Sequence, residues 1–121
     1  MLPPQIGATT EIGREKMKLP ILHLNLKKRW FDMIASGEKQ EEYREIKPYW
    51  QKVFVCGLIK IGGICHLPKN VIICFSHGYN KNRPQMRFKC RGLVTRTGRP
   101  VWGAEPGKEY FVIQIGERKI R

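Results

Sequence analysis

One short segment places a lysine, a glutamate and an arginine at a spacing that suits ligand binding. Residues 37–44 read Gly-Glu-Lys-Gln-Glu-Glu-Tyr-Arg, so Lys39 is followed by Glu42 and Arg44. On an extended strand, Glu42 and Arg44 would share one face and pair, which keeps the carboxylate ionised and able to accept hydrogen bonds from a base or ribose. We expect Lys39, at the preceding turn, to be free to contact a phosphate. The alternative is an internal salt bridge that serves only the fold.

A second set of candidate residues alternates along a predicted basic strand. Between residues 86 and 94, apolar side chains alternate with Arg87, Lys89 and Arg91, which we expect to point outward. Neighbouring cations on one face of a strand lie about 6–7 Å apart, a separation comparable with that of adjacent phosphates on a nucleic acid strand. These three residues therefore predict a phosphate track.

A polar loop is predicted directly after the apolar run 71–75. Its sequence begins Ser-His-Gly-Tyr-Asn at residue 76, and it can present Ser76, Tyr79 and Asn80 to a ligand. Tyr79 is suited to stack on an unpaired base. The loop therefore extends the candidate binding residues beyond the basic strand.

The charge of the chain favours an anionic partner. Twenty-three Lys and Arg residues face ten Asp and Glu residues, a net charge of +13, and residues 46–104 contain no acidic residue. Each cation that replaces a counterion on a phosphate backbone contributes to binding, so this composition favours nucleic acid or nucleotide ligands. Two alternatives are a basic surface that serves solubility and an accessory protein that docks an acidic partner.

The length of 121 residues fits a single domain. Residues 1–16 contain two adjacent prolines and no hydrophobic period, so we expect a flexible leader before a domain over residues 17–121. The sequence has neither a signal-peptide pattern nor an apolar run that could span a bilayer, which favours a monomeric cytoplasmic protein with four free thiols. We expect no metal and no cofactor, because the Cys and His residues between 65 and 77 lack the paired spacing of structural zinc sites.

The hydrophobic pattern predicts an α+β fold. Strands are expected at residues 21–26, 40–46, 71–75, 86–94 and 110–115, and helices at 26–36 and 48–54. Asn25 would cap the first helix, and Gly37 would end it in a left-handed conformation. Because short strands outnumber the helices, we expect a small barrel of about five to six strands with two or three short helices.

The segment 37–44 has the form G-x-K-x-x-E-x-R and follows a predicted strand and helix. It resembles the signature of the ASCH family, which belongs to the PUA-like superfamily of small RNA-associated β-barrels. The order of the predicted elements agrees from about residue 20 to residue 116. The resemblance implies a PUA-like barrel with a cationic cleft near Lys39, Glu42 and Arg44 that binds RNA, another nucleic acid or a nucleotide.

The same resemblance implies an enzymatic alternative. Some small members similar to this chain are amidohydrolases that cleave acylated cytidine with a Lys, a Thr and a Glu. Lys39 matches the motif lysine, and their threonine aligns with Glu42, which cannot act as a hydroxyl nucleophile. Their distant glutamate has no counterpart between residues 46 and 104. Lys39 and Glu42 are the candidate catalytic residues in this alternative.

Overall fold

The protein is described by a computed structural model that covers residues 18–120. The predicted leader, residues 1–16, lies outside the described residues. The helices and strands are β1 (Ile21–Leu26), α2 (Lys28–Ala35), β2 (Glu41–Glu45), α3 (Pro48–Val53), β3 (Phe54–Val55), β4 (Leu58–Ile61), β5 (Ile64–His66), β6 (Ile72–His77), β7 (Gln85–Thr97) and β8 (Glu109–Lys119), with short 3-10 helices at Pro68–Asn70 and Pro100–Trp102.

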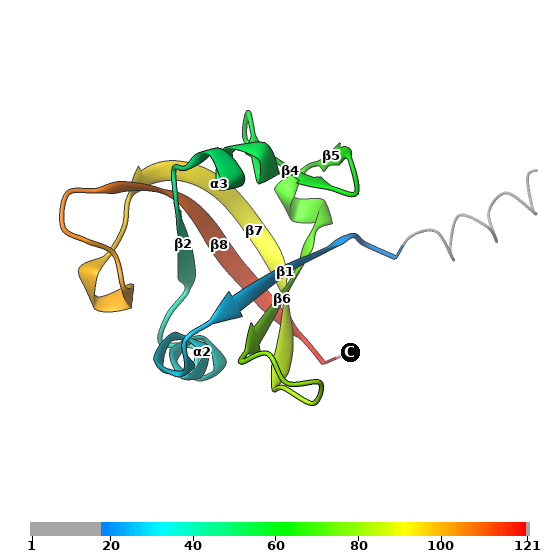
Figure 1. Ribbon diagram of the computed structural model, residues 1–121, viewed down its shortest axis with the longest axis vertical. Helices are drawn as coiled ribbons and strands as arrows, with labels where there is room; N and C mark the ends of the chain where they lie inside the picture. The colour runs from blue at the N-terminus through cyan, green and yellow to red at the C-terminus, as the bar shows by residue number, and fades with distance from the viewer. Residues whose placement is uncertain (1–17, 121) are drawn as a thin grey trace, which may run out of the picture.

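The strands form two sheets, which confirms the predicted α+β class (Figure 1). The large sheet has the strand order β1-β6-β7-β8-β2, with β1 and β6 parallel and the other neighbours antiparallel. The small sheet is the meander β3-β4-β5. Within residues 18–120 the barrel is not closed, because β1 and β2 remain edge strands of the large sheet.

The strands predicted by alternation lie where the pattern placed them. In β7 the exposed and buried residues alternate from Gln85 to Arg91, so the apolar side chains face the core, and Arg87 and Lys89 face outward. The apolar run 71–75 becomes the interior strand β6, whose first five residues are all buried. Such a run is typical of a strand that is covered on both faces.

The predicted cap of the first helix was wrong. Asn25 belongs to β1, and α2 begins after Lys27, which makes no side-chain capping hydrogen bond. The side chain of Asn25 instead donates to Gly78 O at 2.7 Å and to Ser76 Oγ at 3.4 Å. The predicted end of the helix is confirmed, because Gly37 has φ of +85°.

The small sheet was not predicted from the sequence. Its strands have two to four residues each, and left-handed residues separate them, with Cys56 and Gly57 in the first turn and Gly62 and Gly63 in the second. Strands this short carry almost no periodic signal. The closing strand also extends beyond the predicted residue 115, to Lys119.

The hydrophobic core lies on the concave side of the large sheet. Strands β1, β6 and β7 direct alternating apolar side chains inward, α2 adds Ile34, and β4 adds Ile59. Ile59, Ile73 and Phe75 are fully buried. No helix within residues 18–120 is long and apolar enough to cross a membrane.

The first prediction tests this core. Replacing Ile73 with alanine removes buried methyl groups from the centre of β6, and we expect a loss of about 2–5 kcal/mol in the free energy of unfolding, measured with urea. Ile64→Ala is the matched control, because Ile64 is 63% exposed in β5, and its loss should stay within about 0.5 kcal/mol. Equal losses in the two variants would contradict the assignment of the core.

Candidate nucleic-acid interface

Lys39 is buried, so the prediction that it would be free to contact a phosphate was wrong. Its side chain is 1% exposed, and its Nζ donates to the backbone oxygen of Trp102 at 2.7 Å and lies 3.2 Å from Glu42 Oε1. The ring centroids of Trp30 and Tyr43 lie 5.4 Å and 4.7 Å from Nζ. Burial lowers the pKa of the Lys39 ammonium, and Glu42 offsets part of that effect. Protein groups therefore surround this ammonium.

Glu42 and Arg44 project from the same face of β2 and pair, as predicted. Arg44 Nη2 donates to Glu42 Oε2 at 2.9 Å and to the backbone oxygen of Asn25, in β1, at 3.0 Å. The guanidinium also lies over the Trp50 ring, 5.1 Å from its centroid. Lys39, Glu42 and Arg44 thus form one network, which we call the buried charge network, and it joins the edge strands β2 and β1.

The other face of β2 holds the loop that precedes β8. Glu41 accepts hydrogen bonds from Arg96 and from the Tyr43 hydroxyl, which in turn accepts from the Arg99 backbone N–H. Burial raises the pKa of Glu41, but the hydrogen bonds from Arg96 and Tyr43 outweigh it, so the net direction is downward. Burial raises the pKa of Tyr43 to about 12. Glu41, Arg96 and Tyr43 thus satisfy one another's hydrogen-bonding groups, which indicates a structural role.

The outward face of the large sheet carries a second group of cations. In the register of the strands, Arg87 lies opposite Lys119 of β8, and Lys89 lies opposite Ile72 of β6. All three cations line one groove of about 740 Å³ together with Lys18, at the entrance to β1. Its other walls are apolar: Leu19, Ile21 and Ile72. We call the four cations around this groove, Lys18, Arg87, Lys89 and Lys119, the basic face.

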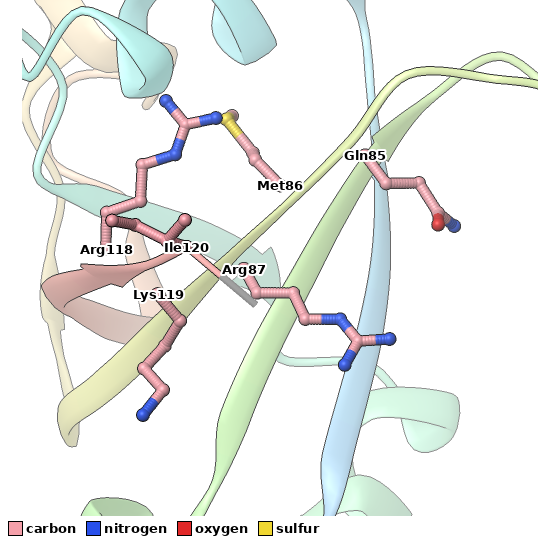
Figure 2. Close-up of a pocket in the computed structure, with 6 residues that line it drawn as sticks. All are labelled: Gln85, Met86, Arg87, Arg118, Lys119 and Ile120. Carbon is pink, nitrogen blue, oxygen red and sulfur yellow. The ribbon is translucent and has the colours of Figure 1, made fainter.

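A second hollow adjoins the basic face at the C-terminal end of β8. It has a volume of about 620 Å³, and Arg87 and Lys119 line it as well as the first groove. Figure 2 shows the side chains of Arg87 and Lys119 extending to one side of the strands, whereas Arg118 and Met86 extend to the other. The two hollows therefore meet at the Arg87–Lys119 pair.

A third, polar hollow lies on the outward face next to the β6–β7 loop. It has a volume of about 280 Å³, and its polar lining comes from His23, Asn25, Ser76, Tyr79 and Arg83. The structure thus places two of the three predicted loop residues together. Tyr79 is 88% exposed, whereas Ser76 lies in β6 and only lines the floor. Asn80 is exposed, and its backbone oxygen accepts from the Arg83 guanidinium.

Arg91 does not join Arg87 and Lys89 in one track. The pairing of β7 with β8 shifts between Phe88 and Gly92, as a β-bulge does, and the strand bends there. Arg91 instead lines a separate hollow of about 300 Å³ beneath the end of α2, with Gly37 and Lys39. The predicted track therefore contains two of its three residues.

Sequence reasoning missed several residues of the outward face. The predicted site lacked Lys18, His23, Asn25 and Lys119. They lie in β1, in β8 or just before β1, and the pairing of these strands with β6 and β7 is not visible in local patterns. The available signal is the alternation of residues 21–26, in which His23 and Asn25 stand between leucines. Within residues 18–120, no group of three or more His, Cys, Asp or Glu side chains is arranged to hold a metal ion.

No family model, no curated protein and no solved structure matches this chain.

The buried charge network yields the second prediction. Glu42→Gln leaves the ammonium of Lys39 and the guanidinium of Arg44 without their carboxylate, and we expect a loss of about 3 kcal/mol in the free energy of unfolding. Lys39→Met should cost less, because Glu42 keeps Arg44 and the aliphatic chain still fills the site. Urea unfolding measures both, and a smaller loss for Glu42→Gln than for Lys39→Met would contradict this assignment.

The third prediction concerns stability in acid. Lys108, helped by Lys47, lowers the pKa of Glu45 from 4.5 to about 2. A lowered folded-state pKa means that the contribution of Glu45 is present above pH 4.5 and is lost as the pH falls to about 2. We expect the stability of Glu45→Gln to depend less on pH than that of the wild type over this range. Thermal unfolding at several pH values measures the difference, and parallel curves would refute the linkage.

Proposed function

We propose that this chain is a nucleic-acid-binding domain, that RNA is the leading candidate for its ligand, and that it contacts phosphates through the basic face. The observation that carries the proposal is the convergence of Lys18, Arg87, Lys89 and Lys119 around one groove. Phosphate contacts of this kind are independent of sequence and supply most of non-specific affinity.

The ion pairs of the structure support this assignment. The cations near β2 are engaged internally: Lys39 and Arg44 with Glu42, Arg96 with Glu41, and Lys108 with Glu45 and Glu105. In the part of the chain that the structure describes, the four cations of the basic face make no ion pair. Glu117, two residues before Lys119, also makes no ion pair within the described residues. The positive charge of the basic face is thus left for an external anion.

The groove also suits a single strand better than a rigid duplex. The cations of β7 and β8 line one wall of the groove. The neighbouring wall is apolar apart from Lys18, because Leu19, Ile21 and Ile72 come from the residues just before β1, from β1 and from β6. A phosphate backbone can lie on the first wall while an unstacked base covers the second. A duplex keeps its bases stacked inside and has nothing to place on the apolar wall.

The resemblance to the ASCH family remains part of the proposal. The order β1, α2 and β2, with the motif at the start of β2, supports it. We propose that the curled large sheet is an open form of the PUA-like barrel, in which Arg44 bridges the two edge strands. The hydrolase alternative has less support, because the Lys39 ammonium is bound by Trp102 and Glu42.

The fourth prediction tests the basic face. Binding of a fluorescent single-stranded RNA should weaken steeply as the salt concentration rises. If all four cations contact phosphates, a plot of log K against log salt should have a slope of about −3. Lys89→Glu should weaken binding about tenfold or more and reduce that slope by about 0.7. Lys52→Glu is the matched control, because Lys52 is exposed on α3, outside the basic face, and should change affinity little.

Two outcomes would contradict the proposed function. One is an affinity for RNA that stays flat between low and physiological salt, because phosphate contacts must release counterions. The other is equal weakening by Lys89→Glu and Lys52→Glu, which would mean that net charge, rather than the basic face, governs binding. Preferential binding of an acidic protein by the same face would support the docking alternative instead.

A further inference from the structure

We propose that the polar hollow beside the basic face reads the Watson–Crick edge of a base that presents an amino group directly beside a ring-nitrogen lone pair, namely cytosine or adenine. This inference rests on the proposed function and makes it more specific. The reading groups are the amide of Asn25 and the hydroxyl of Ser76, and Tyr79 lines the same hollow.

Strand pairing places the two reading groups side by side. Asn25 and Ser76 are 51 residues apart in the chain but are direct partners in the parallel pair β1–β6. The Asn25 Nδ2 group donates one hydrogen to Gly78 O at 2.7 Å and faces Ser76 Oγ at 3.4 Å. These contacts fix the rotation of the amide. Both of its hydrogens are directed at protein acceptors, and Ser76 sits at the floor of the hollow.

The hydrogen-bonding groups of Asn25 and Ser76 that are not used within the described residues define the ligand. Among the described residues, Asn25 Oδ1 has no hydrogen-bond donor, and Ser76 Oγ, which receives a hydrogen bond, still has its own hydrogen to donate. The site therefore offers one acceptor, Asn25 Oδ1, and one donor, the Ser76 hydroxyl, on two residues that are partners in the β1–β6 pair. Cytosine matches it with its N4 amino group and N3 lone pair, and adenine with its N6 amino group and N1 lone pair. Uracil and guanine present the opposite order, with a carbonyl beside a ring N–H.

The surroundings of the hollow fit a nucleotide. Tyr79 is 88% exposed on the loop and can stack on the base, and Arg83 supplies a cation on the same rim. Asn25 lies four residues along β1 from Ile21, which lines the groove of the basic face, a separation of roughly 13 Å. A short single strand can thus place phosphates on the basic face and one base in the hollow. Because the Watson–Crick edge is used, that base must be unpaired.

The test compares two ligands that differ mainly in this edge. Cytidine and uridine hexamers carry the same backbone, and we expect the wild type to bind the cytidine hexamer about tenfold more tightly at one fixed salt concentration. Fluorescence anisotropy measures both. Ser76→Ala should bring the cytidine affinity close to the uridine value and leave the uridine value unchanged. Tyr79→Ala should weaken both hexamers by a similar factor, because stacking does not depend on the edge.

Two controls keep the result independent of folding. Ser36→Ala removes the same hydroxyl from an exposed position at the end of α2 and should leave the preference for cytidine intact. A hexamer of N4,N4-dimethylcytidine removes the amino donors from the ligand and leaves the protein untouched, and it should bind no better than uridine. This second measurement holds even if Ser76→Ala does not fold.

The outcomes separate this inference from the function on which it rests. Equal binding of the cytidine and uridine hexamers, or preference for uridine, would overturn the reading of the amino group while leaving nucleic-acid binding intact. Tight binding of the dimethylated hexamer would do the same. Failure to bind any hexamer at low salt would overturn the proposed function and this inference with it.

Discussion

The contact on which the fold depends most is the one that Arg44 makes between the two edges of the large sheet. Strands β1 and β2 have no ladder between them, and the Arg44 guanidinium, held by Glu42, donates to the backbone oxygen of Asn25 across the gap. Lys39 carries the network on to Trp102, in the segment before β8. One charged cluster therefore ties β1, β2 and that segment together, in place of the hydrogen bonds that would close a barrel.

This use of the network decides where ligand chemistry can occur. A buried ammonium or guanidinium is stable only when partners replace its lost water, and in this protein Glu42, Trp102 and Asn25 are those partners. Lys39, Glu42 and Arg44, which the sequence suggested as ligand-binding residues, consequently make structural contacts within the protein. The outward face differs, because the four cations of the basic face make no ion pair within the described residues. For this reason we propose phosphate contacts on the outward face rather than at the buried charge network.

The sequence was sufficient for features that a local pattern encodes. Alternation located β7 and the direction of Arg87 and Lys89, the apolar run located β6, and Gly37 located the end of α2. It was insufficient for pairings between distant segments. The same eight-residue motif is compatible with a free or a buried Lys39, and only the approach of Trp102, 63 residues away, makes the difference. The bulge that diverts Arg91 likewise arises from the register with β8, which no window along β7 contains.

The parallel pairing of β1 with β6 shows how topology creates the hollow for which we propose base recognition. It brings Asn25 beside Ser76 and, through the loop that follows β6, beside Tyr79 and Gly78. Asn25 was predicted to be a helix cap because its amide is a good local acceptor, and the structure directs that amide toward a strand and a loop instead. The hydrogen bond to Gly78 then orients the side chain and turns a conformationally free amide into a fixed acceptor on an open surface. Selectivity for a base needs such fixed groups, whereas attraction for phosphates needs only charge. The base recognition and the phosphate contacts that we propose therefore involve different residues of one sheet face.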